Sequence, residues 1–149
     1  MQIPDQIERE VVVDAPIERV WSLITEAEYF GAWFADSGAE IDLRPGGAMT
    51  LRWEEHGTVR ARVERVEPPR RFSYRWANAV DVEPSEGHST LVEFTLSAED
   101  AGTRVRVVES GFASLDSSDE DRRRQIDDNT EGWAIQLRNL SEQAGRTVA

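Results

Sequence analysis

The last third of the chain decides the fold: residues 117–144 read SSDEDRRRQIDDNTEGWAIQLRNLSEQA. Apolar or small side chains recur there every three or four residues, at Ile126, Thr130, Trp133, Leu137, Leu140 and Ala144. This spacing predicts one buried stripe on an amphipathic helix of roughly six turns. We expect the helix to begin after Ser117 and Ser118, because Ser117 and Glu120 have the spacing of a capping box.

The segment before this helix, from about Gly38 to Gly111, favours strands. Strands are expected over residues 39–43, 48–54, 58–67 and 72–76, followed by a hairpin whose connection is residues 98–102. In such strands apolar and polar residues alternate, which is typical of a sheet with one buried face. A curved sheet closed by one long helix encloses a space between them. We expect function to reside in that space.

The N-terminal part predicts one strand and two short helices. Residues 7–13 are rich in β-branched side chains, and Pro16 suits the first turn of a helix. Thr25 and Glu28 have capping-box spacing, which predicts a second helix carrying Tyr29, Phe30, Trp33 and Phe34. The predicted class is therefore α+β, in the order strand, two helices, about six strands and one long helix.

Composition narrows the class of protein. With 149 residues and 39% hydrophobic content, residues 1–149 are expected to form a single domain around one core. The sequence has no apolar run of about 18 residues and no signal-peptide pattern at its start, so we expect a cytoplasmic protein without membrane insertion. All 17 basic residues are arginines, which suggests a GC-rich bacterial genome, and cysteine is absent.

The charge distribution argues against nucleic acid as a partner. The net charge is −12 and the pI about 4.6, whereas nucleic-acid binding depends on clustered cations. The one basic cluster, residues 122–124, directly follows the acidic residues 119–121, so the two triplets are expected to compensate each other on adjacent helical turns. Arg44, beside a Pro-Gly-Gly turn, either meets an anion or forms a salt bridge at the sheet edge.

Glu109 is the acidic residue that the pattern places inward. It continues the alternation of Val105 and Val107, so its carboxylate should point to the apolar side of the sheet. Burial then requires hydrogen bonds, an ion pair, protonation or a place near an opening. Glu109 either orients a ligand or acts as a general base, or it is a structural carboxylate held by a backbone N–H or an arginine. On the outer face, Glu93 is expected opposite Arg106.

No catalytic, metal or cofactor site is predicted. His56 and His88 adjoin glycines in expected turns, and two histidines without a spaced carboxylate or thiolate make a poor metal site. The sequence contains no G-x-S-x-G, H-E-x-x-H or P-loop motif. Nucleophilic, zinc-hydrolase and P-loop chemistry therefore have no local signature.

An ordered set of short motifs points to a known superfamily. The motifs are DAPIERVW at 14–21, WF at 33–34, RPGG at 44–47, VEPPRRF at 66–72, TRV at 103–105, ESGF at 109–112 and GW at 132–133. The set resembles the SRPBCC (START-like) superfamily, and within it the group named for homology to the C-terminal domain of the activator of the 90-kDa heat-shock-protein ATPase. The resemblance implies the helix-grip fold, a seven-stranded antiparallel sheet around a long C-terminal helix. It also implies a hydrophobic cavity, which various members use for lipids, sterols, plant hormones or polyketide intermediates.

Three functional hypotheses follow from the residues and the resemblance. The first is non-catalytic binding of a small hydrophobic ligand, entering past residues 77–88 and 112–118 and lined by Met49, Leu51, Trp53, Tyr74, Trp76, Phe94, Val107, Glu109, Thr130, Trp133 and Leu137. The second is a cyclase or dehydratase in which Glu109 or Tyr74 moves protons. The third is an interaction module for a chaperone or another protein partner. The chain is expected to be a monomer or a homodimer.

Overall fold

The computed structural model describes residues 5–35, 37–55, 57–100 and 102–145. Within these residues the strands form one seven-stranded antiparallel sheet, flanked by three α-helices and one 3-10 turn. The elements are β1 (Gln6–Val13), α1 (Ile17–Thr25), α2 (Ala27–Trp33), β2 (Ala39–Ile41), β3 (Ala48–Trp53), β4 (Gly57–Glu67), β5 (Arg71–Ala77), β6 (Ser89–Glu99), β7 (Gly102–Ser110), η1 (Phe112–Ser114) and α3 (Asp119–Gly145). This order confirms the predicted helix-grip α+β fold.

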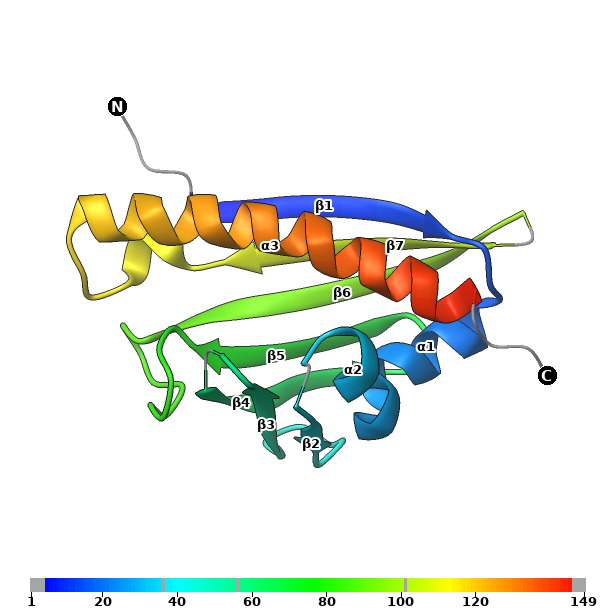
Figure 1. The fold of residues 1–149 in the computed structure, drawn as a ribbon, viewed down its shortest axis with the longest axis horizontal. Helices are drawn as coiled ribbons and strands as arrows, with labels where there is room; N and C mark the ends of the chain where they lie inside the picture. The colour runs from blue at the N-terminus through cyan, green and yellow to red at the C-terminus, as the bar shows by residue number, and fades with distance from the viewer. Residues whose placement is uncertain (1–4, 36, 56, 101, 146–149) are drawn as a thin grey trace.

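The sheet follows the order β1-β7-β6-β5-β4-β3-β2, so its edges are β1 and the three-residue strand β2. The long helix α3 crosses one face of this sheet, and the two short helices lie near the C-terminal end of α3 (Figure 1). Helix α2 therefore contributes side chains to the same interior as α3 and the inward face of the sheet.

The predicted stripe of α3 is confirmed as its buried face. Ile126, Trp133, Leu137, Leu140 and Ala144 are all buried. The remaining member of the stripe, Thr130, is half-buried, and its hydroxyl donates to the Ile126 carbonyl at 2.6 Å. The helix therefore lies on the sheet along the line that the sequence predicted.

Helix α3 begins at Asp119, directly after Ser117 and Ser118 as predicted, but its capping residue differs from the prediction by one position. Ser118, not Ser117, caps the helix, because its Oγ accepts a hydrogen bond from the Asp121 backbone N–H at 3.1 Å. The adjacent charge triplets compensate as expected, with Arg122 paired to Asp119 at 2.9 Å and Arg124 to Asp121 at 3.0 Å. No helix in the described parts of the chain is apolar over enough length to cross a bilayer.

The capping box predicted for α2 is wrong. Thr25 is the last residue of α1, and its hydroxyl donates to the Trp21 carbonyl at 2.7 Å. Glu26 precedes α2 in an extended conformation, and no side-chain hydrogen bond caps the helix there. A threonine hydroxyl can bond back to the carbonyl four residues earlier within a helix, and this local bond replaces the predicted capping role.

The register of the β6–β7 hairpin also differs from the prediction. Glu93 lies opposite Val108, and Arg106 lies opposite Thr95 and forms an ion pair with Glu8 of β1. The strands continue to Glu99 and Gly102, so the connection is shorter than the five residues that the sequence suggested. The position of the turn sets the register of a hairpin, so a turn centred elsewhere changes every cross-strand pair.

Aromatic side chains from α2 fill the deep part of the interior. The ring centroids of Phe30 and Tyr74 lie 6.2 Å apart, and those of Trp33 and Phe94 lie 6.5 Å apart. Trp33 also donates its indole N–H to the Leu23 carbonyl at 2.7 Å. The space between the sheet and α3 is therefore packed at the end where α2 enters it.

Candidate functional site

Glu109 is the centre of a buried hydrogen-bond network. Its side chain points inward as predicted, and the residue is only 1% exposed. Its partners, which we call the Glu109 network, are Trp76, Thr90, Asn129 and Trp133. Trp133 Nε1 donates to Oε1 at 2.8 Å, while Trp76 Nε1 and Thr90 Oγ1 donate to Oε2 at 2.9 and 2.5 Å. Asn129 Nδ2 lies 3.1 Å from both oxygens.

All the hydrogen-bond partners in this network are neutral donors. An ionised carboxylate accepts only, and its two oxygens match two indole N–H groups, a hydroxyl and an amide. The sequence had suggested a backbone N–H or an arginine instead, so the burial prediction is confirmed while the predicted partners are wrong. Because the donors come from β5, β6 and α3, the network fixes the position of α3 relative to the sheet.

Tyr74 lies in the same interior with an unpartnered hydroxyl. Its side chain is fully buried, and its hydroxyl oxygen forms no hydrogen bond with any residue that the structure describes. Burial raises the pKa of the phenol well above its usual range, and the charge of Glu109 raises that pKa further. Tyr74 is therefore held neutral, and it contributes packing rather than a hydrogen bond.

Tyr74→Phe is expected to leave the free energy of unfolding at neutral pH unchanged, or to raise it by up to about 1 kcal/mol, because it removes a buried hydroxyl without a partner. Above pH about 10 an unfolded tyrosine loses its proton while the folded Tyr74 keeps it, so wild-type stability falls there through this group and the variant's does not. Urea unfolding of both proteins at pH about 8 and about 11 measures the difference. A constant difference, or a loss above about 1 kcal/mol at pH about 8, would contradict this assignment.

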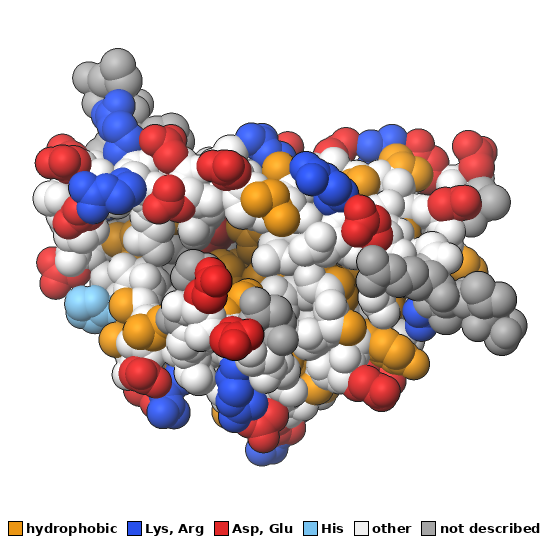
Figure 2. All heavy atoms as spheres, viewed as in Figure 1, with side chains coloured by type: hydrophobic (Ala, Val, Ile, Leu, Met, Phe, Trp, Pro, Cys, Tyr) orange, Lys and Arg blue, Asp and Glu red, His pale blue; other side chains and the backbone are white. Residues whose placement is uncertain are grey.

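Two adjoining pockets open beside the network, between α3 and the β3–β5 part of the sheet. The first has a volume of about 250 Å³ and is lined by Trp53, Val59, Trp76, Ala77, Asn78, Ala79, Val80, Gln125 and Asn129. The second, of about 110 Å³, is lined by Phe34, Trp53, Trp76, Asn129, Gly132, Trp133 and Gln136. Figure 2 shows a hollow below α3 with hydrophobic side chains inside it. Trp53, Trp76 and Asn129 belong to both pockets.

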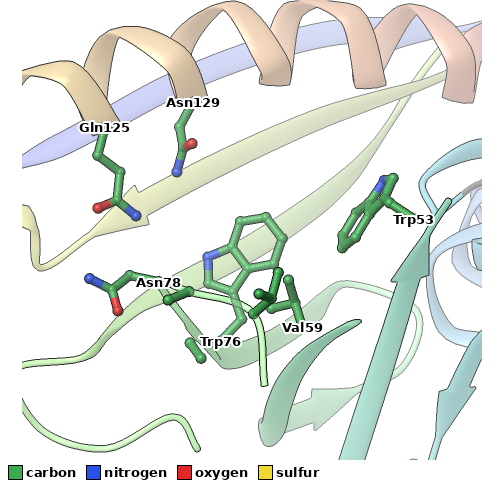
Figure 3. A pocket seen from close by; sticks show the side chains of 9 residues that line it. Trp53, Val59, Trp76, Asn78, Gln125 and Asn129 are labelled. Atoms are coloured by element: carbon green, nitrogen blue, oxygen red, sulfur yellow. The ribbon is translucent and has the colours of Figure 1, made fainter. Parts of the chain in front are cut away.

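Indole rings and carboxamides dominate the first pocket. Gln125 and Asn129 project from α3 above the Trp76 ring, and Asn78 lies beside that ring (Figure 3). The Trp53 indole N–H is already used, because it donates to the Phe34 carbonyl at 2.9 Å. No charged residue appears among the described residues that line either pocket. This surface can bind an apolar ring and form a small number of neutral hydrogen bonds.

The structure separates the residues that the sequence had grouped as one ligand site. Trp53 and Trp76 line both pockets, Trp133 lines the second, and Glu109 lies behind Trp76 and Asn129. Thr130 is half-buried and lines neither pocket. The other members are packed in the core, each at most 4% exposed, and these are Met49, Leu51, Tyr74, Phe94, Val107 and Leu137.

The carboxamides of α3 were missed by the sequence reasoning, although a pattern marks them. Gln125, Asn129, Gly132 and Gln136 are spaced by four, three and four residues, as in the buried stripe but displaced by one position. This spacing places them on a helix face that adjoins the stripe. Residues 77–80 begin the segment that the sequence predicted as a ligand entrance, and all four line the first pocket.

The remaining candidate residues take no part in this site. Arg44 forms an exposed ion pair with Asp42 at 2.8 Å, which favours the salt-bridge interpretation over anion binding. His88 is exposed beside Gly87, and His56 lies outside the described residues.

Comparison with a family model decides the relationship of the chain. Residues 14–145 match the family described as activator of Hsp90 ATPase homolog 1-like protein. The chain belongs to this family. This match supports the SRPBCC superfamily that the motifs resemble, and solved structures share the fold. A search of curated proteins returns no match.

Several solved structures share the fold. The protein MLL2253 of Mesorhizobium loti is 23% identical, with a TM-score of 0.79 over 97% of this chain and 99% of that one. CalU16 of Micromonospora echinospora is 26% identical, with a TM-score of 0.69 over 95% of this chain and 76% of that one. DynU16, from the dynemicin biosynthetic locus, is 18% identical with a TM-score of 0.77, and 97% of this chain covers 48% of DynU16.

Proposed function

We propose that this protein binds one small, largely apolar molecule in the first pocket and leaves it chemically unchanged. The observation that carries the proposal is the pocket of about 250 Å³ between α3 and the sheet, with Trp53 and Trp76 in its wall. Pockets for drug-sized ligands span roughly 300–1,000 Å³, so the ligand is expected to be smaller, with one or two rings. Of the residues that the sequence predicted as the ligand site, only Trp53 and Trp76 line this pocket.

The state of the acidic and phenolic groups supports binding without catalysis. Both oxygens of Glu109 already accept hydrogen bonds from the network, and the carboxylate lies behind Trp76 and Asn129. Tyr74 is fully buried. A general acid or base must lie within hydrogen-bond reach of the proton that it transfers, and neither residue lines the two pockets.

The interaction-module hypothesis finds less support. Among the described residues, the exposed large hydrophobic side chains are Val12, Leu43, Val80 and Ile135. They belong to β1, the β2–β3 connection, the β5–β6 loop and α3, so the set is distributed over four segments. A docking surface is marked by a contiguous apolar patch rather than by scattered apolar residues. The pocket is therefore the better-supported site.

Val80→Trp is expected to abolish ligand binding by filling the first pocket. Val80 lies in the pocket wall and is 44% exposed, so the larger ring can occupy the pocket without disturbing the core. Isothermal titration calorimetry with 2-naphthol, a neutral two-ring probe, measures the effect. We expect binding to the wild type and a loss of affinity of at least roughly tenfold in the variant, since a filled pocket excludes the ring.

Val12→Trp is the matched control for this experiment. Val12 is 49% exposed on β1 and does not line the pocket, so this variant should bind 2-naphthol as the wild type does. If Val80→Trp and the wild type bind the probe equally, the ligand does not occupy this pocket. The proposed function fails if no compound in a panel of neutral one-ring and two-ring molecules releases heat on titration or raises the thermal midpoint of the protein.

A further inference from the structure

We propose that the pocket selects neutral ring compounds carrying a hydroxyl or N–H donor, and that it discriminates against carboxylates. This inference rests on the proposed function and names the class of ligand. It follows from three features of the described residues: which N–H groups are already used, which amide atom is left for the ligand, and where the nearest buried charge lies.

The two tryptophans of the pocket offer ring carbon rather than hydrogen-bond donors. Trp53 donates its N–H to the Phe34 carbonyl at 2.9 Å. Trp76 donates its N–H to Thr90 Oγ1 and to Glu109 Oε2, both at 2.9 Å. A ligand acceptor that competed for either N–H would have to break a hydrogen bond that the protein already makes. The indoles therefore favour flat apolar surface on the ligand.

Asn129 presents an acceptor to the pocket. Its Nδ2 is committed to Glu109, 3.1 Å from each carboxylate oxygen, so the orientation of the amide is fixed. Its other amide atom, Oδ1, forms no hydrogen bond with another residue of the described ranges, and Asn129 lines both pockets. A carbonyl oxygen accepts only. A ligand hydroxyl or N–H satisfies it, whereas an ether or a carboxylate oxygen does not.

The charge of Glu109 adds discrimination against anions. Asn129 and Trp76 touch the carboxylate on one side and line the pocket on the other, so a ligand bonded to Asn129 lies one side chain away from a buried negative charge. The hydrogen-bond partners of that charge are neutral, and the residues that line the two pockets include no cation among those described. Like charges repel more strongly in such a poorly screened place than in water.

Three naphthalene probes of similar size test the inference by calorimetry at pH about 7, where carboxylic acids are ionised. They are 2-naphthol, which carries a donor, 2-methoxynaphthalene, which lacks one, and 2-naphthoate, which is anionic. We expect 2-naphthol to bind roughly tenfold more tightly than each of the others, the ratio that one net hydrogen bond of about 1.4 kcal/mol produces. If 2-methoxynaphthalene or 2-naphthoate binds as tightly as 2-naphthol, the inference fails while the proposed function stands. If no probe binds, the proposed function itself fails.

Asn129→Ala separates the contribution of the hydrogen bond to Asn129 from that of the ring contacts with Trp53 and Trp76. The variant should lose the preference for 2-naphthol over 2-methoxynaphthalene and retain binding of the latter, because the rings still meet Trp53 and Trp76. Asn139→Ala is the matched control, since Asn139 lies on the same helix, bonds to Gln136 at 3.2 Å and lines neither pocket. An unchanged preference in Asn129→Ala, with both variants folded by circular dichroism, would overturn the role of Asn129. If Asn129→Ala does not fold, the wild-type probe ratios decide the inference.

Discussion

Glu109→Leu is expected to lower the free energy of unfolding by about 3–5 kcal/mol, the largest effect of any single substitution in the network. The leucine removes the acceptor of two indole N–H groups, one hydroxyl and one amide, all of which stay buried or half-buried. Each buried donor left without a partner costs about 1–3 kcal/mol. Chemical denaturation in urea, followed by circular dichroism, measures the loss.

Glu93→Leu provides the control on the same sheet. Glu93 is exposed on the outer face of β6, and a substitution there is expected to change stability by about 0.5 kcal/mol or less. Glu109→Gln should lower the free energy of unfolding by an intermediate amount, because the glutamine amide keeps one acceptor oxygen but directs an N–H₂ group at other donors. If Glu109→Leu costs no more than Glu93→Leu, the network does not hold α3 on the sheet.

Trp33→Ala is expected to destabilise the protein by about 3–5 kcal/mol and to create a binding cavity in the core. Trp33 is 4% exposed, and its indole packs against Phe30, Phe34 and Phe94. The substitution removes this packing and leaves the Leu23 carbonyl without its donor. An apolar cavity of this kind binds small aromatic molecules, so benzene should raise the thermal midpoint of the variant by more than it raises that of the wild type.

Trp21→Ala is the matched control for that experiment. Trp21 is only partly buried, with one edge-to-face contact to Phe72 at 6.4 Å, so its loss should cost less and leave no closed cavity. Equal stability losses in the two variants would contradict the distinction between a core tryptophan and a peripheral one. A failure of benzene to stabilise Trp33→Ala would show that the interior collapses into the space.

The elements of the fold that depend on local periodicity were predictable from the sequence. The stripe from Ile126 to Ala144 fixed the helix and its buried face, and alternation along β7 placed Glu109 inside. Both predictions rest on a sequence repeat within one helix or strand, whose apolar side chains must all face the same apolar layer. Turn lengths and caps were less accessible, because Thr25 and the β6–β7 connection are each compatible with two local arrangements.

The content of the interior could not be read from the sequence. Whether the space between sheet and helix is open depends on where Phe30, Trp33 and Phe34 point, which is set by contacts between α2 and distant strands. Similarly, the donors to Glu109 come from positions 19 to 33 residues away in the chain. No periodic pattern links Trp76 to Glu109, so the network is visible only in three dimensions.

The two edges of the sheet have a consequence for self-association. One edge, β1, carries exposed Glu8, Arg9 and Glu10, and the other, β2, is three residues long. Charged side chains and very short strands both oppose the addition of a foreign strand by backbone pairing. Edge-to-edge stacking into extended ribbons is therefore disfavoured, and a homodimer would have to form through side chains on a helix or on the outer face of the sheet.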